Sequence, residues 1–75
     1  MMKKRKIKMY IIYRIRSDET REYFRSFGVW GKINFSKNPD EAHHIEIFYE
    51  AEHTLSLVRE TMDEYSNIQM KYIRD

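Results

Sequence analysis

The chain has 75 residues, of which 41% are hydrophobic and 35% charged; it contains no cysteine and has a formal net charge of +2. This length predicts a single domain over residues 1–75 with a modest core, and the apolar content is too high for a disordered chain. The lack of cysteine excludes disulfides and cysteine-ligated metal, and it favours a reducing compartment such as the cytoplasm. No apolar stretch approaches the roughly 18 residues of a membrane span, so we expect no membrane association.

Basic residues are concentrated at the start of the chain. Residues 1–16 contain seven lysines or arginines and no acid, whereas residues 17–75 contain seven bases and twelve acids. We therefore expect residues 1–6 to form a basic N-terminal tail. Such a segment attracts nucleic acid, an acidic partner or the acidic part of another copy, and it equally serves to keep an edge-prone strand soluble.

The first predicted element is a strand over residues 7–16, where the apolar pattern has a period of two. Its odd positions, from Ile7 to Ile15, are all apolar, so we expect this face in the core and the even face open. The next stretch, "SDETREYFRSFG", has an N-cap candidate at its start, aromatic residues at helical spacing and Gly28 as a stop signal. It predicts a helix of about ten residues.

Period-two alternation returns in "VWGKINFS", residues 29–36, and again in "HHIEIFYE", residues 43–50, with a turn at Asn38, Pro39 and Asp40 between them. These two predicted strands form a hairpin. Residues 51–66 then place Leu55, Val58 and Met62 at steps of three and four, which predicts the longest helix. A last strand is expected from residue 68 to residue 72.

The predicted order β-α-β-β-α-β indicates an α+β fold. Right-handed crossovers within one sheet favour a ferredoxin-like arrangement, with four antiparallel strands in the order 4-1-3-2 and two helices on one face. The other face of the sheet would then be uncovered. This topology hosts many unrelated functions, so it assigns none by itself.

The uncovered face is the predicted binding site. Its apolar centre and mixed-charge rim are typical of protein interfaces. We therefore expect a small non-enzymatic protein that binds another protein, either a second copy or a larger host factor, in the manner of an adaptor or a phage-encoded inhibitor. The expected binding residues are Tyr10, Ile12, Arg14, Trp30, Lys32, Phe48, Lys71 and Ile73.

The alternative function is single-stranded RNA or DNA binding on the same face. RNA-recognition modules have this topology, and bases would stack on Tyr10, Trp30 or Phe48 while lysine and arginine contact phosphates. Glu46 and Glu50, however, would repel phosphate next to Phe48. A third alternative is an ordinary wet surface that binds nothing.

The sequence contains no motif for catalysis, metal or cofactor binding. His43 and His44 are adjacent in a predicted strand and would point to opposite faces, so they could not readily share one ion. The only glycines are Gly28 and Gly31, which leaves no phosphate-binding loop. We expect no catalytic centre, no metal site and no cofactor.

Overall fold

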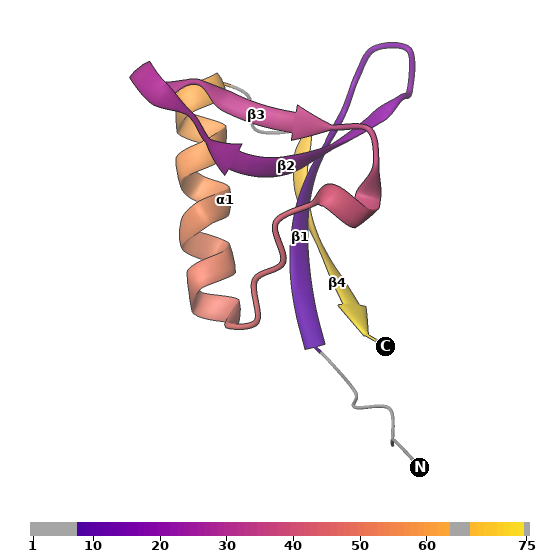
Figure 1. The fold of residues 1–75 in the computed structure, drawn as a ribbon, viewed down its shortest axis with the longest axis vertical. Helices are drawn as coiled ribbons and strands as arrows, with labels where there is room; N and C mark the ends of the chain where they lie inside the picture. The colour runs from indigo at the N-terminus through magenta and orange to yellow at the C-terminus, as the bar shows by residue number, and fades with distance from the viewer. Residues whose placement is uncertain (1–7, 64–66, 75) are drawn as a thin grey trace.

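The computed structural model describes residues 8–63 and 67–74, and the predicted basic tail at residues 1–6 lies outside these ranges. Four strands form one antiparallel sheet in the order β3-β2-β1-β4, and the one α-helix of the described residues packs beside it (Figure 1). The elements in chain order are β1 (Lys8–Ile15), β2 (Arg21–Phe27), η1 (Val29–Gly31), β3 (Ile33–Ser36), η2 (Pro39–Glu41), α1 (Phe48–Met62) and β4 (Ile68–Arg74).

The predicted ferredoxin-like fold is wrong, because the described residues contain one α-helix instead of two and the strand order is not 4-1-3-2. The segment predicted to be the first helix is β2. Its aromatic residues have helical spacing, but aromatic side chains also favour strands, and the preceding acids form a tight turn instead of a helix cap. Asp18 accepts hydrogen bonds from the backbone N–H and the hydroxyl of Thr20, and Glu19 adopts a left-handed φ of 68°.

The predicted third strand, residues 43–50, is also wrong. Only Ile45 pairs with the sheet, through two backbone hydrogen bonds with Tyr10, and the helix already begins at Phe48. The backbone N–H of Ala51 donates to the carbonyl of Ile47 at 3.0 Å, which closes the first turn. The predicted helix therefore begins three residues too late, and its predicted end at residues 64–66 lies outside the described residues.

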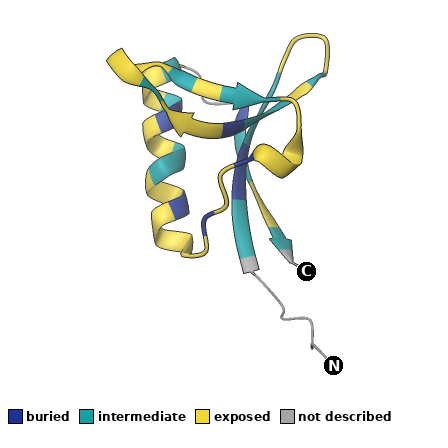
Figure 2. Ribbon diagram, in the orientation of Figure 1, coloured by how far each residue is buried: buried dark blue, intermediate teal, exposed yellow. Residues whose placement is uncertain are grey.

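The core lies between α1 and the even-numbered face of β1. It consists of Ile12, Phe24, Ile45, Ala51, Val58 and Ile68, and Figure 2 shows buried residues on β1, on α1 and in the segment between η2 and α1. The predicted orientation of β1, with its odd face inward, is thus wrong. Ile11 and Ile12 are both buried, so alternation alone could not identify the face that meets the helix.

The sheet is strongly bent where β2 leaves β1. Pairing between these strands is recorded from Ile15↔Arg21 to Tyr13↔Tyr23, and the β2–β3 pairing then shifts register between Phe24 and Ser26. The segment 43–45 fills the fork that opens between β1 and β2, since His43 donates to the carbonyl of Phe24 and Ile45 pairs with Tyr10. In Figure 1 the β2–β3 hairpin accordingly crosses the β1–β4 pair and extends over α1.

Candidate interaction surfaces

The eight predicted binding residues do not share one face. Ile12 is 0% exposed and belongs to the core. Tyr10 and Arg14 are half-buried on the side of β1 that faces α1, and Phe48 lies in the first turn of α1. The prediction that these residues form one open surface is wrong because it depended on the inverted orientation of β1.

The other four predicted residues lie in two further regions. Trp30 and Lys32 are exposed at the turn between β2 and β3, far from the β1–β4 pair in Figure 1. Lys71 and Ile73 pair with Ile11 and Met9, which places them on the face of the sheet turned away from α1. We call this the outer face. This is the face of the sheet opposite α1, as expected for the uncovered face, but it has different residues, and one of them, Ile11, is buried.

The connection between β2 and β3 spans residues 28–32 and contains a β-turn, residues 29–32, whose two central residues are both left-handed. The backbone N–H of Lys32 donates to the carbonyl of Val29 at 3.1 Å, and that of Gly28 donates to the carbonyl of Lys32 at 2.6 Å. Trp30 has φ 60° and ψ 32°, and Gly31 has φ 73°. This is the geometry of a type I′ hairpin turn, whose first central position normally holds Asn, Asp or Gly.

Trp30 occupies that position while 99% exposed. A left-handed backbone costs a residue with a Cβ roughly 1–2 kcal/mol, and burial of the indole does not offset this cost. Val29 and Phe27 are exposed beside it. We call Phe27, Val29 and Trp30 the hairpin end. The predicted strand over residues 29–36 is therefore wrong at its start, because β3 begins only at Ile33; Gly31 in "VWGK" was the sequence signal for a turn.

A second apolar surface surrounds the first turn of α1. The ring of Tyr10 lies 5.4 Å from that of Phe48 and 5.1 Å from that of Tyr72, measured between centroids. Phe48 and Tyr72 are each more than 40% exposed, and Ile47 and Tyr49, the neighbours of Phe48 in the chain, are exposed as well. We call these five residues the α1-start cluster. The sequence prediction placed Tyr10 and Phe48 on one surface but did not include Tyr72, the last residue of the last predicted strand, among the binding residues.

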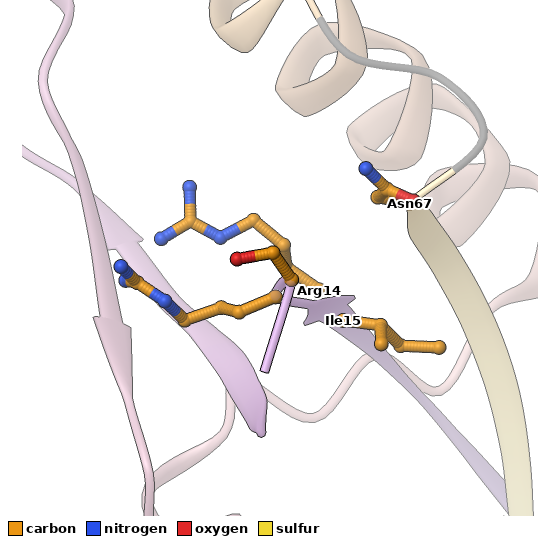
Figure 3. A pocket seen from close by; sticks show the side chains of 5 residues that line it. Arg14, Ile15 and Asn67 are labelled. Atoms are coloured by element: carbon orange, nitrogen blue, oxygen red, sulfur yellow. The ribbon is translucent and has the colours of Figure 1, made fainter. Parts of the chain in front are cut away.

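A shallow depression of about 290 Å³ lies at the end of β1, lined by Arg14, Ile15, Arg16, Ser17 and Asn67. In Figure 3, Ile15 points away from Arg14, and Asn67 lies across from them at the start of β4. Glu22 is within 2.5 Å of Arg14 and 3.3 Å of Arg16. The hydrogen bond from Arg14 lowers the pKa of Glu22, which therefore stays ionised at neutral pH and offsets the arginine charge.

The described residues were also compared with the requirements of a metal site and of acid–base chemistry. They contain no group of three histidine, aspartate or glutamate side chains that could hold a metal ion. Asp18 and Glu22 both have lowered pKa values, through hydrogen bonds from Thr20 and Arg14 respectively, which suits charge pairing better than proton transfer near neutral pH. Within the same residues, no helix combines the length and apolarity needed to cross a bilayer.

Comparison with known proteins does not add a relative. Neither the protein-family models, nor the curated proteins, nor the solved structures searched gave a match to this chain. Function must therefore be inferred from the hairpin end, the α1-start cluster and the outer face.

Proposed function

We propose that this chain is a small, non-enzymatic binding protein that attaches to another protein through the hairpin end, with Trp30 as its anchor. The observation that carries this proposal is a tryptophan that is 99% exposed on a left-handed backbone. A residue that is unfavourable for its backbone conformation, and that contributes no packing in return, is expected at a functional position. Tryptophan is also among the residues most enriched at binding hot spots.

A partner that buried the Trp30 side chain would gain binding free energy. Burying about 200 Å² of indole surface at about 25 cal/mol per Å² supplies an upper estimate of about 5 kcal/mol, before the costs of association are subtracted. The tight turn holds the backbone below the indole in one conformation, so little ordering of the chain remains to oppose binding. A protruding, preorganised tryptophan therefore fits a pocket on a larger protein.

This geometry agrees with an adaptor or an inhibitor of phage type that occupies a site on a larger host factor. The comparison rests on size and architecture, and the absence of cysteine supports a cytoplasmic setting. The α1-start cluster lies at the other end of α1 from the hairpin end in Figure 1, so the two surfaces can contact different parts of a partner.

The test compares two exposed aromatic residues changed in the same way. Trp30→Asn removes the anchor and suits the left-handed turn, whereas Tyr49→Asn removes an aromatic side chain that is 78% exposed in the α1-start cluster. Wild type and both variants are immobilised, and the proteins that each retains from an extract of the source cells are quantified. We expect a defined partner to be lost with Trp30→Asn and kept with Tyr49→Asn.

Two other results would contradict the proposal. Equal retention by Trp30→Asn and wild type would show that the hairpin end is not the contact. Loss with Tyr49→Asn alone would move the contact to the α1-start cluster. Sedimentation of the purified protein tests whether the partner is a second copy, since Trp30→Asn should then convert a dimer to a monomer.

A further inference from the structure

The outer face carries aromatic and basic side chains in register across three strands. Tyr13 pairs with both Tyr23 on β2 and Gln69 on β4, and the two tyrosine rings lie 6.5 Å apart. Arg21, beside Ile15, places its guanidinium 5.3 Å from the centre of the Tyr13 ring. Both tyrosines are half-buried, and Arg21 and Lys71 are exposed.

Basic residues without acids distinguish the outer face on β1, β2 and β4. Of the four basic residues on β1 and β4, only Lys71 lies on the outer face, and Arg21 on β2 adds a second base there. Residues 46–63, which include α1, contain five acids and one base. On β2 and β3, the residues in phase with Tyr23 are Arg21, Ser26, Asn34 and Ser36. Glu41 reaches this face only at its β3 corner, where it accepts a hydrogen bond from Ser36 and lies 3.9 Å from Arg25.

We propose that the outer face binds single-stranded nucleic acid, with unpaired bases stacking on Tyr13 and Tyr23 and phosphates contacting Arg21 and Lys71. Half-exposed rings on a sheet offer flat surfaces to unpaired bases, and the basic residues beside them attract the backbone. Lys71 pairs with Ile11 and Arg21 pairs with Ile15, and these two positions are about 13 Å apart along β1. The two basic side chains therefore flank the tyrosines.

This surface avoids the difficulty that weakened the nucleic-acid alternative in the sequence. Glu46 and Glu50 were expected beside the stacking rings, but Glu50 lies in the first turn of α1 and Glu46 in the segment just before it, so neither belongs to a strand of the sheet. The outer-face positions of β1, β2 and β4 carry no carboxylate among the described residues. This surface is separate from the hairpin end, so its role stands or falls independently of the proposed protein contact.

The test is a titration of the full chain into labelled single-stranded RNA and DNA of mixed sequence, followed by fluorescence anisotropy at several salt concentrations. We expect saturable binding that weakens as salt rises. A plot of the logarithm of the association constant against the logarithm of the salt concentration has a negative slope. Lys71→Gln should make this slope shallower by about 0.7, because one phosphate contact is lost. Tyr13→Leu, which keeps apolar volume but removes the aromatic ring, should weaken binding by about 5- to 100-fold.

The matched control is Lys32→Gln, which removes the same charge in the β2–β3 turn, away from the tyrosines, and should leave both the affinity and the salt dependence unchanged. Far-UV circular dichroism confirms that each variant is folded. Undetectable binding by the wild type would overturn the proposal. Unchanged binding by the triple variant Arg21→Gln, Lys71→Gln and Tyr13→Leu would also overturn it, because other basic residues, such as those in residues 1–6, would then attract the nucleic acid. The proposal would also be overturned if the protein bound anionic vesicles as tightly as nucleic acid and Tyr13→Leu did not weaken that binding. The partner would then be a charged membrane surface.

Discussion

Replacing Trp30 by asparagine should make the protein more stable. The indole is 99% exposed, so its removal loses almost no buried surface, while the backbone at φ 60° is one that asparagine adopts more easily. A left-handed conformation costs a residue with a Cβ roughly 1–2 kcal/mol, and asparagine recovers part of this through local hydrogen bonding. We expect a gain of about 1 kcal/mol in the free energy of unfolding.

Thermal and urea denaturation followed by far-UV circular dichroism measure this gain without relying on tryptophan fluorescence. A gain of about 1 kcal/mol in a domain of this size raises Tm by roughly 4–8 °C, and the urea m value should stay constant. An unchanged or lower midpoint for Trp30→Asn would refute the claim that the turn is strained.

Two further variants separate backbone strain from other effects. Trp30→Ala removes the same exposed ring but keeps a Cβ that disfavours the left-handed region, so it should gain less than Trp30→Asn. Gly31→Ala should destabilise, although an added Cβ there meets nothing within 4 Å, because φ is +73°. Equal gains for Trp30→Asn and Trp30→Ala would show that the backbone is not the cause.

Two other predictions follow from the core and from the ion pairs. Ile12→Ala should lower the free energy of unfolding, measured by urea denaturation, by about 2–5 kcal/mol, because Ile12 is 0% exposed on the α1 side of β1. Ile15→Ala, on the outer face, should cost clearly less. A larger loss for Ile15→Ala than for Ile12→Ala would restore the orientation of β1 with its odd face inward. Glu22→Gln should destabilise at pH 7, since Arg14 lowers the pKa of Glu22 below 4.5 in the folded state. A carboxyl group whose pKa is lower in the folded state stabilises the fold above its unfolded pKa, and this stability is lost as pH falls through the folded pKa. The difference in unfolding free energy between wild type and Glu22→Gln should therefore narrow below about pH 4.5. A difference that is constant with pH would exclude the ion pair as its source.

Where local pattern and tertiary structure agree, the sequence located the elements well. The alternation in residues 7–16 falls on β1, and the spacing of Leu55, Val58 and Met62 falls on α1. All three helix residues contribute to or pack against the core. Apolar residues that alternate strictly with polar ones, or that recur at steps of three and four over several turns, can be buried together only in a strand or in a helix, respectively.

The errors occurred where two patterns are compatible with the same residues. In β2, Tyr23, Phe24 and Phe27 satisfy helical spacing, and a bulge then lets Phe24 and Phe27 share one face of a strand, with their rings 5.0 Å apart. In β1, isoleucine on both faces left the orientation undetermined. That choice decided the predicted site, since it moved Tyr10, Ile12 and Arg14 to the open face and hid Tyr13.

The pairing of β1 with β4 has a consequence for synthesis of the protein. β1 is central in the sheet, and its contacts with β4 join residues about 60 positions apart, such as Met9 and Ile73. A growing chain can form the β1–β2 and β2–β3 hairpins early, but one edge of β1 stays unpaired, and Ile12 lacks its neighbour Met70, until residues 68–74 have left the ribosome. The nascent chain therefore passes through a stage with an open strand edge, during which a chaperone or another nascent copy can pair with β1.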